Sequence, residues 1–248
     1  MQTVQENLRL FVYVEEVNYM KIGLVIADIY EFMPIEKIVK QGNGEIINLL
    51  GDKCALFTIE SGNKSAQVYA VLCGIGKVNA AAATANLINL GCETIINSGL
   101  SGAIDVLKPG DFTVGTKYIE HDFDLTPLGY KKYEKPLQEY IYNADDSLVK
   151  IFTEMGLMPG VMAAGDSFIC CNIKNQELKT NLKAISCDME SAACAAICAK
   201  AKVKFAAVRK ISDGADDDAT KTYKELNEQA LPDLVDIVIN GIKILINQ

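Results

Sequence analysis

The sequence has 248 residues, of which 50% are hydrophobic and 23% are charged, and its formal net charge is -8. This composition is typical of a globular protein of one large domain or two small ones. The negative charge and the scattered basic residues argue against a nucleic-acid partner, because phosphate binding needs clustered Lys and Arg. No apolar run reaches the ~18 residues of a membrane span, so no membrane partner is expected.

The first nineteen residues contain no apolar core and no small-residue cleavage site, so they are not typical of a signal peptide. Met20 comes directly before a strong strand pattern. Residues 1–19 are therefore expected to be either a weakly ordered extension or the product of an upstream start codon. Residues 20–248 contain no linker, low-complexity tract or clear repeat, which predicts one domain.

Strand-like and helix-like stretches alternate along the chain. The apolar run 21–27 is typical of a strand covered on both faces, and the alanine-rich stretch 77–91, which ends at Gly91, predicts a helix. The other expected strands are 54–60, 67–75, 94–100, 112–120, 160–165 and 203–211, with a turn of small residues after 94–100. The other expected helices are 146–156, 189–201 and 223–246, the last with Pro232 inside it.

This alternation predicts an α/β fold: a single domain with a central parallel or mixed sheet flanked by helices. Ligands of such sheets bind beyond the carboxyl ends of the strands. The unusual residues of this sequence follow the expected strands, so that is where a site is expected. They lie in the stretches 27–32, 73–81, 97–103, 121–130, 165–169, 187–191 and 209–216.

Several common sites do not match the sequence. The glycine turn at 73–81 fits neither a dinucleotide fingerprint nor a Walker A loop, so Gly74 and Gly76 form either a tight turn or a close approach to a ligand. The single histidine, His121, leaves no catalytic triad. The eight cysteines, with Cys170 and Cys171 adjacent, match no zinc spacing. Neither a metal nor a cofactor is therefore expected, and free thiols favour a cytoplasmic location.

Carboxylates remain as the candidate chemical groups. Glu31 and Asp213 follow expected strands, and Asp188 and Glu190 lie at the start of the expected helix 189–201. Cleavage of a glycosidic bond uses such a set, with one protonated carboxyl group for the leaving group and another carboxylate to activate water. Acid–base chemistry by carboxylates is therefore the leading possibility from the residues alone, and glycosidic cleavage is one reaction that would use them.

Six stretches, in this order, resemble motifs of the purine nucleoside phosphorylase/hydrolase superfamily, most closely those of the 5'-methylthioadenosine/S-adenosylhomocysteine nucleosidase family. They are "CGIGKVNAA" (73–81), "IINSGLSGAI" (95–104), "HDFDLTPLGY" (121–130), "GDSFI" (165–169), "DMES" (188–191) and "VRKISDGAD" (208–216). The likeness runs from about Met20 to the C-terminus. It implies a phosphorylase/hydrolase-like fold and hydrolysis of thio-substituted adenine nucleosides, with release of adenine as in methionine salvage.

The resemblance also implies roles for single residues. Asp213 matches the general acid that donates to N7 of the departing purine, and Ser212 orients it. Glu31 matches the base that activates the attacking water. Glu190 matches the carboxylate that binds the ribose hydroxyl groups, and Met189 packs against the sugar.

The remaining matches concern the purine pocket, the water site and a partner subunit. Phe168 and Ile169 match the purine pocket, and Arg209 matches an arginine near the water. Asp188 aligns with an acidic residue of the family, although capping of the helix 189–201 explains it equally well. The resemblance further implies a homodimer in which Leu125 and Leu128 reach the neighbouring site, with His121 as a structural or interface residue.

The sequence departs from the family pattern in places. Asp28 stands in place of a methionine that meets the ribose, Leu100 in place of a serine at the nucleophile site, and Cys73 in place of a serine. Asn97 stands where related phosphorylases have a phosphate-binding arginine, which favours water. Because Arg209 is present, phosphorolysis stays open. The Asp28 and Leu100 replacements also leave open a nucleoside-binding protein without turnover. The other aspartates near Asp213 are expected in a solvated loop: Asp216, Asp217 and Asp218.

Overall fold

The computed structural model describes residues 20–227 and 231–248, so the expected extension 1–19 lies outside the described residues. The strands are β1 (Met20–Ile26), β2 (Gly44–Leu49), β3 (Asp52–Ser61), β4 (Lys64–Leu72), β5 (Thr94–Ala103), β6 (Phe112–Glu120), β7 (Ile141–Asn143), β8 (Met158–Ala164), β9 (Ala184–Asp188) and β10 (Lys204–Asp213). The helices are α1 (Ile29–Ile38), α2 (Lys77–Asn89), α3 (Asp146–Glu154), α4 (Asn172–Leu182), α5 (Ser191–Ala201), α6 (Ala219–Asn227) and α7 (Pro232–Asn247), with short turns η1 (Val39–Asn43) and η2 (Thr126–Leu128).

These strands form one mixed sheet in the order β10-β6-β8-β9-β5-β1-β4-β3-β2, with β7 paired to β6. An additional pairing of β10 with β5 closes β5, β10, β6, β8 and β9 into a ring. The pairings of β1 with β4 and β5, and of β5 with β10, are parallel. The carboxyl ends of β1, β4, β5 and β10 therefore lie at the same edge of the sheet. This arrangement confirms the predicted single-domain α/β fold with a mixed sheet flanked by helices.

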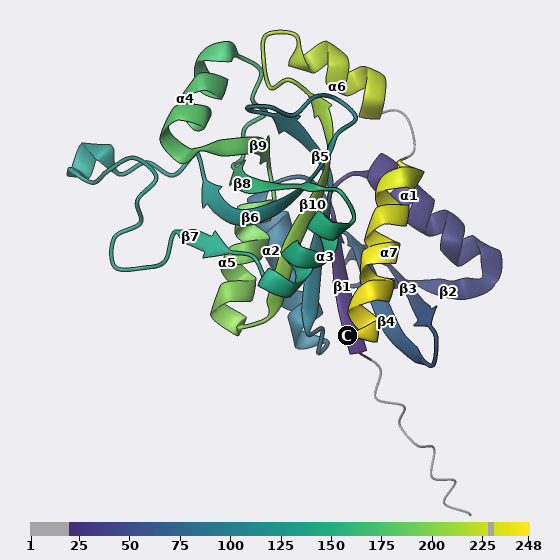
Figure 1. Ribbon diagram of the computed structural model, residues 1–248. Helices are drawn as coiled ribbons and strands as arrows, with labels where there is room; N and C mark the ends of the chain where they lie inside the picture. Colours follow the sequence, from purple (N-terminus) through teal and green to yellow (C-terminus); the bar gives the residue numbers. More distant parts are fainter. Residues whose placement is uncertain (1–19, 228–230) are drawn as a thin grey trace, which may run out of the picture.

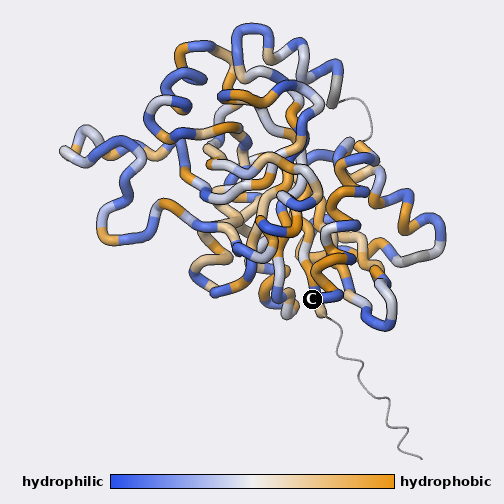
Figure 2. Tube along the Cα trace, viewed as in Figure 1, coloured by the Kyte–Doolittle hydropathy of each residue, from blue (hydrophilic) through white to orange (hydrophobic). Residues whose placement is uncertain are grey.

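Helices cover both faces of the sheet, as the pattern of β1 requires. Ile22, Leu24 and Ile26 belong to a hydrophobic cluster that includes residues of α1, α3 and α7. Val25, which points to the other face, belongs to a second cluster with residues of α2 and α5. Figure 1 shows α4 and α6 near the end of the sheet at which β10 ends, and Figure 2 shows hydrophobic residues gathered on the inner strands.

Strand β5 extends farther than the sequence predicted. A turn of small residues was expected after residue 100, but the strand continues to Ala103, and all ten of its residues are buried. The small residues serve close approach instead: a Cβ atom on Gly99 would lie 2.8 Å from both carboxylate oxygens of Glu31. The small side chains of this strand therefore leave room for the groups that face it.

The C-terminal prediction of one helix over 223–246 is wrong. Two helices, α6 and α7, occupy this region, and Pro232 is the first residue of α7. Proline is favoured at the first helical position, where its missing N–H would have no intrahelical partner. Helices α1 and α4 and strands β2, β7 and β9 were not predicted, because their short apolar patterns are irregular. No helix in the described ranges has the length and apolar character needed to cross a bilayer.

Candidate active site

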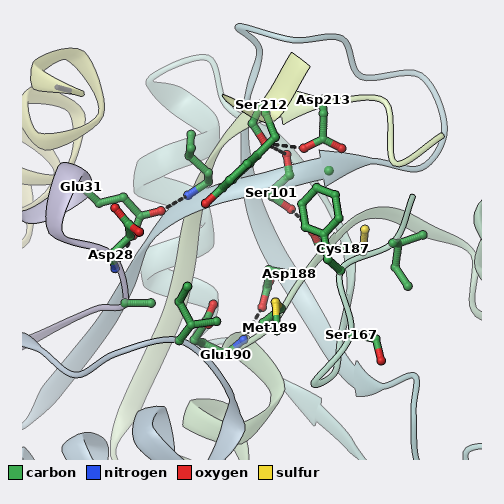
Figure 3. Close-up of a pocket in the computed structure, with 17 residues that line it drawn as sticks. Asp28, Glu31, Ser101, Ser167, Cys187, Asp188, Met189, Glu190, Ser212 and Asp213 are labelled. Carbon is green, nitrogen blue, oxygen red and sulfur yellow. Dashed lines mark hydrogen bonds between the residues drawn. The ribbon is translucent and has the colours of Figure 1, made fainter. Parts of the chain in front are cut away.

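A cavity opens beyond the carboxyl ends of β1, β5, β9 and β10 (Figure 3). Its empty volume, including the open mouth, is about 580 Å3. All the predicted site residues line it except Arg209, which is buried and does not reach the cavity surface. The lining residues are Ala27, Asp28, Glu31, Ile75, Leu100, Ser101, Gly102, Ser167, Phe168, Ile169, Cys187, Asp188, Met189, Glu190, Ser212, Asp213 and Tyr223.

Glu31 enters the cavity from the first turn of α1. Asp28 caps this helix: its Oδ1 accepts from the N–H of Tyr30 at 2.8 Å, and its own N–H donates to Oε2 of Glu31 at 3.3 Å. The other oxygen of Glu31 accepts from the N–H of Leu100 on β5 at 2.7 Å. Burial raises the pKa of Glu31 from 4.5 to about 8, against the opposing effect of the Leu100 N–H. The capping box thus places a carboxyl group of raised pKa against β5.

Asp213 is the last residue of β10 and is almost fully buried. Its Oδ1 accepts from the N–H of Ala215 at 2.8 Å, and its Oδ2 lies 2.6 Å from the donating hydroxyl of Ser212. Burial raises the pKa of Asp213, although both hydrogen bonds act to lower it. The strand end therefore favours a protonated carboxyl group that faces the cavity.

Asp188 and Arg209 form a buried ion pair beside the cavity. Nε of Arg209 lies 3.3 Å from Oδ2 of Asp188, and the guanidinium also donates to the side chain of Asn97. Oδ1 of Asp188 accepts from the N–H groups of Glu190 and Ser191 at 2.9 and 2.7 Å. Burial alone would raise the pKa of Asp188, but Arg209 and the Ser191 N–H hold it below its ordinary value. Asp188 thus both lines the cavity and satisfies N–H groups at the start of α5.

The side chain of Glu190 accepts a hydrogen bond from the N-terminal end of helix α2. Its Oε1 accepts from the N–H of Gly76 at 2.9 Å, and its Oε2 lies 3.9 Å from Nη2 of Arg209. Burial raises the pKa of Glu190, while Arg209 acts to lower it. Gly74 and Gly76 have φ values of +85° and +103°, which favour glycine. These two glycines therefore form the tight turn before α2 that presents a backbone donor to Glu190.

A group of charged residues outside the cavity fixes the same turn. The N–H of Lys77 donates to Oδ1 of Asp166 at 2.8 Å, and the N–H of Asp166 donates to Oδ2 of Asp122 at 2.9 Å. The ammonium group of Lys77 contacts Glu120 at 2.9 Å and Asp122 at 2.7 Å. The stretch 165–169 is therefore anchored at Asp166 before it reaches the cavity. Asp122 and Asp166 lie within the quoted motifs, but no local pattern indicates that they contact each other and Lys77.

The cavity has an apolar side that includes a residue the sequence reasoning missed. Tyr223 of α6 packs edge-to-face against Phe168, with ring centroids 5.3 Å apart. Burial and then the nearby carboxylates raise the pKa of Tyr223. Tyr223 was not predicted as a site residue, because it lies in the expected helix 223–246 and belongs to none of the motifs. Ile75, Ser101, Ser167 and Cys187 lie within stretches that the sequence analysis singled out, but no role was predicted for them.

Three residues of the stretch 121–130 lie outside the cavity lining. His121 is buried. Its backbone N–H donates to the carbonyl of Ala164 at 2.9 Å, whereas the two nitrogens of its imidazole ring have no protein partner. Leu125 is half-buried, and 70% of Leu128 is exposed. Within the described ranges, no group of three His, Cys, Asp or Glu side chains is placed to hold a metal ion.

Residues 21–242 match the family model described as "Phosphorylase superfamily". Two similar curated proteins are 5'-methylthioadenosine/S-adenosylhomocysteine nucleosidases. The one from Staphylococcus carnosus is 37% identical over 188 residues, which are 72% of this chain and 82% of that protein. The one from Buchnera aphidicola subsp. Schizaphis graminum is 32% identical over 216 residues, which are 83% and 89% of the two chains.

A similar solved structure is that of the nucleosidase of the same description from Helicobacter pylori. It superposes with a TM-score of 0.82 at 27% identity and covers 90% of this chain and 97% of its own. That protein was crystallised with a pyrrolidinol that carries an aminopyrrolopyrimidine group. The likeness covers the fold of most of this chain.

The raised pKa of Glu31 predicts a pH-dependent change in stability. Its folded pKa of about 8 exceeds the ordinary value of 4.5, so the protonated form stabilises the fold and this contribution is lost as pH rises through that window. Glu31→Gln cannot ionise, so its stability relative to the wild type should increase from about pH 4.5 to pH 8. At about 1.4 kcal/mol per pKa unit, the upper limit of the increase is about 5 kcal/mol.

Urea denaturation of both proteins between pH 5 and 9 measures this difference. Glu45→Gln, which changes an exposed carboxylate on β2, is the matched control and should follow the wild type at every pH. A difference between Glu31→Gln and the wild type that stays constant with pH would contradict the raised pKa.

Proposed function

The chain belongs to the phosphorylase superfamily, and we propose that its cavity binds 5'-methylthioadenosine- or S-adenosylhomocysteine-type nucleosides and hydrolyses their N-glycosidic bond. It is an N-glycosyl hydrolase, as its curated relatives are nucleosidases of this description. One observation carries the choice of water over phosphate: the described lining residues include five carboxylates and no Lys, Arg or His. A phosphate dianion would find no cationic side chain along this lining.

Arg209 does not change this conclusion. Its guanidinium is buried, and it is already paired with Asp188, Asn97 and, at longer range, Glu190. A buried cation needs such partners, because an unpaired charge in the interior is costly. The arginine therefore supports the wall of the cavity and offers no free cationic group for phosphate.

Asp213 acts as the general acid in this proposal. As the bond between C1' and N9 breaks, the electron pair moves into the purine and N7 takes the proton from Asp213. Burial raises the pKa of Asp213, which favours the protonated form that this transfer needs. Ser212, whose hydroxyl lies 2.6 Å from Oδ2, orients the carboxyl group.

Glu31 and Glu190 act on the sugar side. The ionised form of Glu31, which its pKa of about 8 leaves partly populated in neutral solution, takes a proton from water while the water oxygen bonds to C1'. The positive charge of the oxocarbenium-like transition state favours ionised carboxylates nearby. Glu190 accepts hydrogen bonds from the ribose hydroxyl groups, and Met189 packs against the sugar. Phe168 and Tyr223 form the aromatic side of the cavity, where Phe168 and Ile169 hold the purine.

We also propose a homodimer in the cytoplasm, with a role in methionine salvage. The stretch between β6 and β7 extends away from the sheet (Figure 1) and exposes Leu128, which would reach the partner's cavity together with Leu125. All eight cysteines are free, as is typical of a reducing compartment.

Sedimentation velocity should give twice the monomer mass for the wild type and a monomer for Leu128→Asp. A monomeric wild type would contradict the dimer.

Product analysis tests the reaction itself. Incubation with 5'-methylthioadenosine should release adenine and methylthioribose in the absence of phosphate, because water is the nucleophile. Added phosphate should change neither the rate nor the products. A strict phosphate requirement with a sugar 1-phosphate product would make the protein a phosphorylase. Nucleoside binding without adenine release would make it a binding protein.

Substitution within the acidic stretch tests the role of Asp213. Asp213→Asn keeps the shape and one acceptor oxygen for the Ala215 N–H, but its amide group cannot transfer the proton, so kcat should fall by about 100-fold or more. Asp217→Asn, which changes an exposed carboxylate four residues later, should stay within about twofold of the wild type. Thermal melting establishes that both variants fold, and equal losses of kcat would remove Asp213 from the proposed role.

A further inference from the structure

Two adjacent cysteines stand apart from the other thiols of the chain. Cys170 and Cys171 are exposed, whereas the other six cysteines are buried. Burial raises the pKa of each of those six thiols, which suppresses the nucleophilic thiolate. They are Cys54, Cys73, Cys92, Cys187, Cys194 and Cys198. A reagent that attacks thiols in the folded protein therefore meets Cys170 and Cys171 first.

The position of the pair in the chain brings it close to the cavity. It directly follows Phe168 and Ile169, which line the cavity. Before it, Asp166 is fixed by its hydrogen bonds with Lys77 and Asp122. The segment 167–171, which contains both cysteines, joins this anchor to Asn172, the first residue of α4.

The far end of the segment is anchored to the loop that follows Asp213. Nδ2 of Asn172 donates to Oδ2 of Asp217 at 2.7 Å. Nδ2 of Asn175 donates to the carbonyl groups of Ala103 and Gly214 at 3.0 and 2.9 Å. Because both ends are held, a bulky group on either cysteine is confined to the neighbourhood of the cavity.

We propose that Cys170–Cys171 is a site of reversible S-thiolation by low-molecular-weight disulfides, and that the attached group obstructs the cavity. This effect on catalysis rests on the proposed hydrolase function, whereas the modification itself does not. In the reaction, a cysteine thiolate attacks one sulfur of the disulfide. A new S–S bond forms, the old one breaks, and the other half leaves as a thiolate that takes up the proton the cysteine lost.

The geometry of adjacent residues favours the mixed disulfide as the product. A bond between Cys170 and Cys171 would need a second exchange, in which one thiol displaces the group from the other. Consecutive Cα atoms across a trans peptide lie about 3.8 Å apart, whereas bridged cysteines usually lie about 4.4–6.8 Å apart. The internal disulfide would therefore be strained, so the attached group is retained until a free thiol removes it.

A group attached to Cys170 or Cys171 is expected to hinder access of the substrate to the cavity. The cavity mouth next to the pair is lined by Phe168, whose ring packs on Tyr223. A tripeptide such as glutathione attached at residue 170 or 171 is as large as the nucleoside itself and carries two carboxylates. It would crowd the mouth and add negative charge beside the carboxylates of the cavity. Modification should therefore raise KM for the nucleoside, by about fivefold or more.

Glutathione disulfide is the probe for the site. The native protein is incubated with it, its intact mass is recorded, and the modified cysteines are located by peptide mapping. Wild type should gain glutathione at Cys170 or Cys171 and at no buried cysteine, and dithiothreitol should remove it. The double variant Cys170→Ser/Cys171→Ser should gain none. Absence of an adduct on the wild type, an adduct on the buried thiols, or a mass lower by two hydrogen atoms would overturn the proposal.

The kinetic arm separates modification from its effect. Glutathionylated wild type should show the raised KM, and dithiothreitol should restore the original value. The double variant should keep the KM of the reduced wild type before and after treatment, since neither cysteine lines the cavity. An adduct at the site with an unchanged KM would overturn the obstruction. If the reduced protein releases no adenine, the proposed function fails instead, and the mass measurement still decides whether the site exists.

Discussion

The buried guanidinium of Arg209 ties together the strands from which the cavity is built. It lies on β10, pairs with Asp188 at the end of β9 and donates to Asn97 on β5. A charge removed from water needs partners on every side, and here those partners come from separate parts of the sheet. Asp188 in turn accepts from the N–H groups of Glu190 and Ser191. The position of Glu190 therefore depends on the pairing of an arginine that does not line the cavity.

Backbone donors hold the carboxylates of the cavity, and this lessens the consequences of two departures from the family pattern. Leu100 replaces a serine, yet it is the N–H of Leu100 that donates to Glu31, and every residue except proline can supply that group. Asp28 replaces a methionine, but one of its oxygens is used to cap α1. The positions of Glu31 and α1 are thus compatible with both replacements, while the side chains themselves shape the cavity wall.

Burial alone does not decide the proton states of the acidic residues. Glu31, Asp188 and Asp213 are all buried, and desolvation acts to raise the pKa of each. Only Asp188 has an arginine in direct contact, and its pKa falls below the ordinary value. The other two accept from backbone or hydroxyl donors, which do not fully offset burial. One structural carboxylate and two groups suited to proton transfer thus arise from the same residue types.

The sequence by itself determined the α/β class and the side of the sheet that carries the site. Strand patterns with polar residues at their ends are local, so Glu31, Asp213 and their neighbours could be found without coordinates. Only the tertiary structure decided that Arg209 lies behind the wall, that Tyr223 of α6 closes onto Phe168, and that β5 runs on to Ala103. The reason is physical: these features depend on contacts between residues far apart in the chain, and no local pattern encodes such contacts.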